Sequence, residues 1–258
     1  MPRPLEPVSP AARLLLGTAF FVLFVAAWAY ATFGGYVSKT FLADPLTMLQ
    51  DGWILLTRFD FHVDIGITIW RVVGGFVIAA LIGVPLGIVM GAYKPVEAFV
   101  EPFVSFARYL PASAFVPLLI LWAGIGEAQK LLVIFMGSVF QIVLMVAVAV
   151  GQTRRDLVEA AYTLGASNGS VVRRVLLPAT APEIAEILRL VLGWAWTYVI
   201  VAEFIGSSSG IGYMIIASQA LLATGQIIFG IIVIGVIGLV SDFAFKALNR
   251  ALFPWRLA

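Results

Sequence analysis

Apolar runs long enough to cross a lipid bilayer recur along this sequence, and they constrain its fold more than any other feature. A membrane-spanning helix needs about 20 consecutive, mostly apolar residues. Six such runs are separated by more polar stretches, at residues 14–33, 66–92, 102–123, 130–150, 184–205 and 226–247. Hydrophobic residues make up 62% of the chain and charged residues only 12%, which is too little polar surface for a soluble domain. The sequence therefore predicts an all-α membrane protein with six transmembrane helices.

The first run could also belong to a secretory signal peptide. Arg3 and Arg13 precede it, and Ala29-Tyr30-Ala31 resembles a cleavage site. The run is nevertheless long enough to span a bilayer, so we expect an uncleaved first helix. We divide the chain into residues 1–65, with an N-terminal tail, the first helix and an external loop, and residues 66–258, a five-helix core with a polar loop at 151–183.

The distribution of basic residues predicts the orientation of these helices. Six spans place both termini on one side of the membrane, and cytoplasmic loops carry an excess of Lys and Arg. The side of the termini collects Arg3, Arg13, Lys94, Arg108, Arg154, Arg155, Arg173, Arg174, Arg189, Lys246, Arg250 and Arg256. The opposite side collects Lys39, Arg58, Arg71 and Lys130. We therefore expect cytoplasmic termini and a cytoplasmic loop at 151–183.

The loop at 151–183 reads as two short helices joined by a turn. Apolar residues recur at helical spacing over 154–164, and Gly165 then ends the helix because glycine tolerates a positive φ. Ser167 or Asn168 can cap a second helix, which Pro178 is expected to end or redirect. By itself, this pattern fits equally well a surface loop that arginines anchor on anionic lipid.

The same loop carries a longer motif. It reads Glu159-Ala160-Ala161, three residues, Gly165, nine residues, Val175, one residue and Leu177-Pro178. This pattern resembles the EAA motif of the permease subunits of binding-protein-dependent ABC importers, with valine in place of isoleucine. Residues 110–126, 202–205 and 210–214 and the stretch Pro85-Leu86-Gly87 are similar to the nitrate, sulfonate, taurine and cyanate branch of that family. The resemblance covers most of the chain after about residue 66.

The resemblance implies a type I ABC importer permease fold and a mechanism of alternating access. In this family the EAA loop is a coupling helix that docks on a cytoplasmic ATPase. The resemblance assigns this role to Glu159, Ala160, Ala161, Gly165 and Pro178; Arg173 and Arg174 add contacts to the ATPase or anchor the loop on lipid. It also implies a second permease copy, two ATPase subunits that bind ATP and Mg, a solute-binding protein and a bacterial inner membrane. The branch implies a small anionic solute: nitrate, a sulfonate such as taurine, cyanate or bicarbonate.

Other chemistries find little support in the sequence. It contains no G-x-x-x-x-G-K-[ST] phosphate loop, so we expect neither ATPase activity nor a cofactor in this chain. The glycines of residues 66–92 instead predict close helix packing. A net charge of +2 gives no reason to expect a nucleic-acid partner, and the absence of cysteine excludes disulfides and thiolate metal sites. Asp60, His62 and Asp64 could imitate a metal site, but polar surface is the simpler interpretation.

Polar residues within the predicted spans are candidates for a translocation path. We select Glu203, Trp194, Tyr198, Gln141, Ser138 and Pro111. Each has a structural alternative: Glu203 could form an ion pair between helices, the other polar groups could bond between helices, and Pro111 could only kink the third span. For Arg108 and Arg189 we favour side chains that extend to the cytoplasmic interface.

Two other classes of protein remain possible. A stand-alone secondary transporter would favour internal repeats with paired broken helices, which the sequence does not show by inspection. An intramembrane enzyme would need a nucleophile with a base, or a metal cluster, in the spans. Neither is visible in the sequence.

Overall fold

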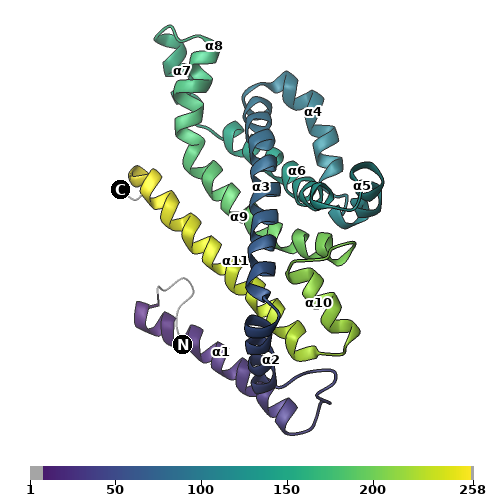
Figure 1. Ribbon diagram of the computed structural model, residues 1–258. Coiled ribbons are helices and arrows are strands. Elements are labelled where there is room, and N and C mark those ends of the chain that lie inside the picture. The colour runs from purple at the N-terminus through teal and green to yellow at the C-terminus, as the bar shows by residue number, and fades with distance from the viewer. Residues whose placement is uncertain (1–7, 257–258) are drawn as a thin grey trace. The chain divides into compact units, whose positions relative to one another are not determined.

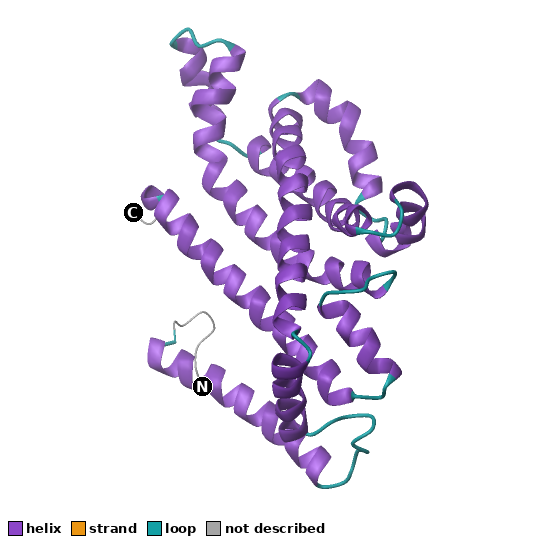
Figure 2. Ribbon diagram, viewed as in Figure 1, coloured by secondary structure: helices purple, strands orange, loops and turns teal. Residues whose placement is uncertain are grey.

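Helices connected by turns and short loops make up the protein. The computed structural model describes residues 8–256, and no strand occurs in that range (Figure 2). Five helical stretches are long and apolar enough to cross a membrane: α1 (Pro10–Phe33), α3 (Phe61–Ala92), α6 (Glu127–Gly151), the run Asn168–Phe204 and α11 (Thr224–Leu252). A bent pair of helices, Lys94–Ala107 and Ala112–Ala123, makes a sixth span if it counts as one. The expected helical class is confirmed, and the sixth span depends on this pair.

The third predicted span is broken. Helix α4 (Lys94–Ala107) is followed by a turn, the 3-10 helix η1 (Ala112–Phe115) and α5 (Val116–Ala123), and the two arms are bent by 84°. Pro111 precedes η1 in an extended conformation (φ −66°, ψ 124°). Proline disfavours the helical conformation in the residue before it and removes a backbone donor. The kink expected at Pro111 is therefore present, and it is large.

Several predicted boundaries are wrong. Helix α3 begins at Phe61, so His62 and Asp64 lie in its first turns and not in a loop. Helix α4 begins at Lys94, where a polar turn was expected; proline fits the first turn of a helix because the N–H it lacks has no partner there. Pro178 does not end a helix but lies in the first turn of α9 (Leu177–Phe204).

The described chain divides into two compact units. The first contains α1, α2 (Pro45–Arg58) and residues 215–232, which include the end of α10 (Ile211–Ala220) and the start of α11. Asp44 caps α2, its carboxylate accepting a 2.8 Å hydrogen bond from the N–H of Thr47. Phe229 packs so closely on Gly52 that a Cβ there would lie 2.3 Å from the ring. A hydrogen bond of 2.9 Å from the indole of Trp28 to the carbonyl of Ala43 ties α1 to the loop before α2.

The second unit, residues 62–214 and 233–258, holds the larger core. Helices α6 and α9 pack along much of their length (Figure 1). Val72, Ile134, Ile142, Val191 and Val199 are buried in this core. Burial of these apolar side chains stabilises the packing of the helices that carry the polar residues described below.

Glycines of α3 let this helix approach α6 closely. A Cβ at Gly75 would lie 2.7 Å from Ile134, one at Gly87 would lie 2.7 Å from the carbonyl of Val143, and one at Gly91 would lie 2.4 Å from that of Ala147. Side chains there would force the helices apart. The packing role predicted for these glycines is confirmed.

Candidate functional site

The polar loop at 151–183 forms a helix–turn–helix segment, as its pattern predicts. We use this name for residues 154–178. Helix α7 (Arg155–Thr163) carries Glu159, Ala160 and Ala161 in its second half. Helix α8 (Asn168–Val171) follows the turn and leads through the π-helical residues Val172–Leu176 into α9. The second half of the segment is thus the first part of one continuous helical run, Asn168–Phe204, that continues into the core.

Gly165 shapes the turn between α7 and α8. Its φ is +81°, a conformation that L side chains adopt at a cost. The N–H of Gly165 donates to the carbonyl of Tyr162 (2.9 Å) and the N–H of Ala166 to that of Ala161 (3.0 Å). This pair of bonds is the Schellman arrangement, which satisfies the last carbonyls of a helix. Ser167 then caps α8, its hydroxyl accepting a 3.4 Å bond from the N–H of Ser170. Both predicted roles, for Gly165 and Ser167, are confirmed.

The π-helical turn explains how Pro178 is accommodated. Within an α-helix, a proline ring collides with the carbonyl four residues earlier and removes one hydrogen bond. Widening the turn at Val172–Leu176 changes that register directly before Pro178. The hydroxyl of Thr180 donates to the carbonyl of Leu176 at 2.8 Å. The helix therefore continues where the sequence suggested an end.

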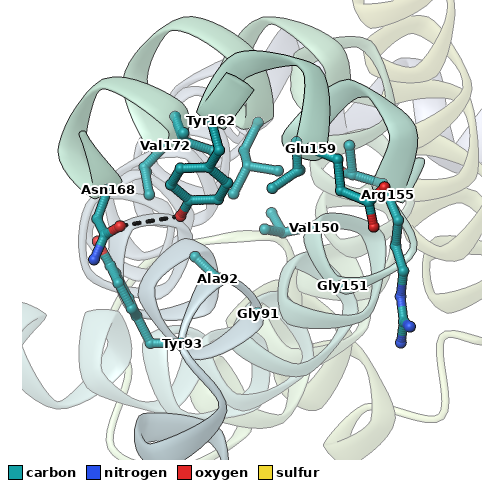
Figure 3. Close-up of a pocket in the computed structure, with 14 residues that line it drawn as sticks. Gly91, Ala92, Tyr93, Val150, Gly151, Arg155, Glu159, Tyr162, Asn168 and Val172 are labelled. Atoms are coloured by element: carbon teal, nitrogen blue, oxygen red, sulfur yellow. Dashed lines mark hydrogen bonds between the residues drawn. The ribbon is translucent and has the colours of Figure 1, made fainter. Parts of the chain in front are cut away.

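One face of α7 packs against the core of the second unit. Val158 and Ala161 pack against that core. Between α7 and the ends of α3 and α6 lies a hollow of about 280 Å³, lined among others by Tyr93, Gly151 and Tyr162 (Figure 3). The hydroxyl of Tyr162 donates a 3.1 Å hydrogen bond to the side chain of Asn168 across the turn. This bond connects α7 to α8.

The other face of α7 is exposed and partly apolar. Leu157 on α7 and Leu164 directly after this helix are exposed, Leu164 to 88%, and no residue of α7 is fully buried. Ala160 is exposed beside them. Glu159 is exposed where it lines the hollow, and Ala161 is half-buried. Arg173, Arg174 and Pro178 are exposed as well. A raised helix with small and apolar exposed residues is suited to docking in a groove of another protein.

A charged pair marks the start of α7. Arg154 and Asp156 form an exposed ion pair. The hydrogen bond from Arg154 lowers the pKa of the Asp156 carboxyl, and the negative charge also suits the N-terminus of a helix. The carboxylate is therefore ionised throughout the neutral range.

The residues selected for a translocation path do not form one cluster. Ser138 is fully buried in α6, where its hydroxyl has no hydrogen-bond partner among the described residues. The ring of Tyr198 packs on Gly137, next in sequence to Ser138, and Gln141 is half-buried one turn later. Trp194 is 42% exposed, and Pro111 is exposed at the break before η1. A path through these positions remains a hypothesis.

Glu203 forms the ion pair between helices that was its structural alternative, within an ionic cluster whose other members the sequence did not reveal. Its carboxylate accepts a 2.8 Å bond from Arg71, and its side chain is completely buried. Arg71 also pairs with Glu127 at the start of α6, and Lys130 lies nearby. Arg71 had been counted only as one of the external basic residues. Sequence offers one signal: an arginine flanked by apolar residues needs an acidic partner.

Arg189 is also paired. Instead of extending alone to the interface, it contacts Glu186 on its own helix and Asp242 on α11. Arg108 lies over the ring of Tyr109, 4.7 Å from its centre. No group of three or more His, Cys, Asp and Glu residues that could hold a metal occurs in residues 8–256, and His62 therefore lies outside any such group.

Comparison with known proteins supplies the family. The model of the family described as "Binding-protein-dependent transport system inner membrane component" matches residues 83–254, two thirds of the chain. The chain belongs to this family. The matched residues include the helix–turn–helix segment and the whole of α9, so the geometry described above is that of an ABC transporter permease.

Curated relatives agree over nearly the full length. A probable ABC transporter permease of Brucella abortus is 34% identical, with 92% of this chain and 93% of the relative covered. The taurine transport system permease TauC of Escherichia coli is 34% identical, with 96% and 92% covered. The putative aliphatic sulfonates transport permease SsuC of Bacillus subtilis is 34% identical, with 90% and 84% covered.

Solved structures support the fold. The permease fold seen in an inward-facing form of the MetNI methionine ABC transporter superposes with a TM-score of 0.64 at 18% identity, covering 83% of this chain and 99% of that chain. Similarity at this level of identity concerns the fold alone.

Proposed function

We propose that this chain is the membrane permease subunit of an ATP-driven importer for a small anionic solute, of the taurine, sulfonate, nitrate, cyanate or bicarbonate type. Its relatives include permeases named for taurine, aliphatic sulfonates and, from Synechococcus elongatus, bicarbonate. A tetrahedral sulfonate and planar bicarbonate share a compact negative charge carried on oxygens. The family assignment gives no support to the stand-alone secondary transporter, the alternative considered above.

The observation that carries the proposal is the exposed face of α7. Glu159 and Ala160 lie on a helix that projects beside a fixed glycine turn, with the exposed Leu164 at its end. In the proposed complex this helix docks in a groove of a separate ATPase, which binds ATP and Mg. Small alanines allow close approach, and the Glu159 carboxylate can pair with a cation of the ATPase.

The continuous helix behind the turn supports transmission of movement. The run Asn168–Phe204 has 37 residues and reaches from the helix–turn–helix segment to the buried Glu203. At about 1.5 Å per residue this run is more than 50 Å long, enough to cross a bilayer. If the ATPase displaces α7, the run can therefore transmit this movement to its opposite end, as alternating access requires.

The proposed assembly contains two permeases, two ATPases and a solute-binding protein in a bacterial inner membrane. The chain termini and the helix–turn–helix segment face the cytoplasm in this arrangement, in agreement with the distribution of basic residues. In this proposal the second permease is an identical copy of the first. Cross-linking of differently tagged copies tests this point.

The decisive experiment is reconstitution with an ATPase subunit and a solute-binding protein that co-purify with this chain. Ala160→Trp places a large ring on the exposed face of α7; we expect it to reduce both co-purification of the ATPase and solute-stimulated ATP hydrolysis by more than tenfold. Ala98→Trp, at an exposed position on α4, is the matched control and should leave both unchanged. If Ala160→Trp assembles and hydrolyses ATP like the unaltered complex, the docking role of α7 is wrong.

A further inference from the structure

Arg71 lies in an ionic cluster with two acidic partners, the enclosed Glu203 and the half-exposed Glu127. We define the ionic cluster as Thr68, Arg71, Glu127, Lys130, Glu203 and Ser209, all in the second unit. It joins α3, the start of α6, the end of α9 and the loop before α10. Neither the family assignment nor the names of the relatives assign a role to it.

Every N–H of the Arg71 guanidinium is occupied. Nε and Nη2 donate to the two carboxylate oxygens of Glu127 at 2.8 and 2.6 Å. Nη1 donates to Glu203 and to the carbonyl of Ser209, both at 2.8 Å, and Nη2 also reaches the Ser209 hydroxyl at 3.2 Å. Only 1% of the Arg71 side chain is exposed. Such a buried cation needs carboxylates or equivalent anions on these edges.

Glu203 is fixed in place. Its carboxylate also accepts hydrogen bonds from the hydroxyl of Thr68 (2.9 Å) and the N–H of Gly212 (2.8 Å) at the start of α10. A Cβ at Gly210, where φ is +106°, would lie 2.4 Å from this carboxylate. Because it is enclosed and accepts from three groups, Glu203 cannot leave Arg71 without leaving a buried charge unpaired.

Glu127 is in the opposite situation. Its side chain is 53% exposed, although it pairs with the buried Arg71. It lies at the first residue of α6, directly after Gly124 and Gly126, and a Cβ at either glycine would meet no atom within 4 Å. Because half of the Glu127 side chain is already open to solvent, water can solvate its carboxylate when it moves away. An anion that supplies two oxygens to the same edge could therefore replace Glu127 without leaving the buried Arg71 unpaired.

A second cation, Lys130, lies beside Glu127. Lys130 is only 3% exposed, and its Nζ is 4.0 Å from Glu127 and 3.1 Å from the carbonyl of Gly126. Without Glu127, Arg71 and Lys130 would be opposed in this group only by Glu203. The remaining acidic neighbour, Asp64, is engaged with the N–H of Gly210 at 2.6 Å. A departing Glu127 therefore leaves a site that favours an anion.

We infer that the Nε–Nη2 edge of Arg71, together with Lys130 and the Ser209 hydroxyl, is a binding subsite for the sulfonate or carboxylate group of a small anion, and that Glu127 occupies it when the anion is absent. A sulfonate presents two oxygens in the spacing that this guanidinium edge binds. The subsite also contacts the loop that leads into α10, so that binding and the position of this loop are linked. The inference rests on the proposed function for the choice of an anionic solute.

The test is a titration of the purified full chain with methanesulfonate at constant ionic strength, with thermal unfolding as the readout and no nucleotide present. Glu127→Gln removes the competing charge. We expect the half-saturating methanesulfonate concentration to fall about tenfold, because a charge-assisted pair of hydrogen bonds is no longer displaced. Glu127→Asp, which withdraws the carboxylate by one methylene group, should lie between the two.

Two controls test whether the tighter binding of methanesulfonate is specific to Glu127 and to the negative charge of the ligand. Glu101→Gln removes an exposed carboxylate on α4 and should titrate like the unaltered chain. Dimethyl sulfone, a neutral analogue of methanesulfonate, should stabilise none of the variants. The inference is overturned if Glu127→Gln and the unaltered chain have equal half-saturating concentrations, if Glu101→Gln shows the same fall, or if dimethyl sulfone acts like methanesulfonate. Because the titration needs no ATPase, its failure is distinct from a failure of the proposed coupling.

Discussion

The hydroxyl of Tyr162 on α7 donates a 3.1 Å hydrogen bond to the side-chain oxygen of Asn168 on α8, and so closes the turn between the two helices. The bond is exposed, and the ring of Tyr162 lines the hollow beneath α7 (Figure 3). The bond is not part of the backbone hydrogen bonding of either helix, and neither residue belongs to the motif. It nevertheless holds the proposed docking helix at a fixed angle to the helix that continues into α9.

Tyr162→Phe tests this contact. The variant keeps the ring but loses the bond, and an exposed hydrogen bond contributes about 0.5–1.5 kcal/mol. We expect a small loss of thermal stability and a larger loss, several-fold, in solute-stimulated ATP hydrolysis of the reconstituted complex. Tyr93→Phe is the matched control, since Tyr93 lines the same hollow and its hydroxyl has no partner among the described residues. Equal hydrolysis by the two variants would remove any role of the bond in coupling.

Gly165→Ala tests the turn itself. A Cβ at Gly165 meets no atom within 4 Å, so the only penalty is the positive φ of 81°, which costs an L residue about 1–2 kcal/mol. We expect the turn to relax and the ATPase to bind more weakly, as measured by co-purification. Gly165→Asn should retain more binding, because asparagine tolerates this conformation better than alanine.

Gly169→Ala is the control for that change. Gly169 lies within α8 without a positive φ, and a Cβ there also meets no atom within 4 Å. Alanine favours a helix, so binding should be kept. A loss of binding in Gly169→Ala equal to that in Gly165→Ala would refute the explanation by backbone conformation.

The close contact of α3 with α6 predicts a large difference between two glycines of one helix. Gly91→Ala brings a methyl group to 2.4 Å from the carbonyl of Ala147, and such overpacking costs about 1–3 kcal/mol. Gly66→Ala meets no atom within 4 Å and should be neutral or stabilising, because alanine is the better helix former. Thermal unfolding in detergent measures both. Equal stabilities of the two variants would contradict the contact.

Much of this fold could be predicted because length and hydropathy are local properties. The apolar runs led to four of the long helices within a few residues at most ends, and the turn at Gly165 followed from the conformational freedom of glycine. The predicted helix boundaries are wrong where contacts between residues distant in sequence determine the local structure. Asp64 looks like a loop residue, but in the structure it accepts a bond from the N–H of Gly210, 146 positions away. Nothing local predicts a helix that begins at Phe61.

The candidate site divides in the same way. Glu159, Ala160 and Ala161 could be found because their spacing matches a motif within one short segment. The ionic cluster could not, since Arg71 and Glu203 are separated by 132 positions and their pairing depends on how α3 and α9 pack. Pro178 differs from its prediction for another reason: a π-helical turn accommodates it, and the local sequence contains no signal for that turn.

The cap of α2 predicts a dependence of stability on pH. Asp44 accepts hydrogen bonds from Thr47 and pairs with Lys39 at 3.1 Å. The bond from the N–H of Thr47 is the largest cause of a lowered pKa, from 3.8 to about 2. Because the folded state holds the carboxylate ionised, its contribution is complete above pH 3.8 and is lost as the pH falls towards 2.

Asp44→Asn should therefore flatten the melting temperature between pH 4 and pH 2, while it lowers this temperature at neutral pH. Asparagine can still cap the helix but carries no charge. Asp60→Asn, at an acidic residue beyond the other end of α2, serves as the control and should keep the slope of the unaltered chain. A slope in Asp44→Asn equal to that of the control would assign the acid sensitivity to other groups.

The two carboxylates on Arg71 predict opposite sensitivities to the same chemical change. Glu203→Gln leaves the buried guanidinium without its enclosed counter-charge, and breaking a buried pair in this way costs about 3–5 kcal/mol. Glu127→Gln changes a half-exposed carboxylate and leaves Arg71 its enclosed counter-charge Glu203, so the loss of stability should be smaller. We expect Glu203→Gln to lower the melting temperature strongly or to prevent purification, and Glu127→Gln to remain near the unaltered chain. Thermal unfolding of both variants in one detergent decides the matter: a Glu127→Gln variant as unstable as Glu203→Gln would mean that the exposed carboxylate is a fixed structural partner of Arg71, in which case no anion could take its place.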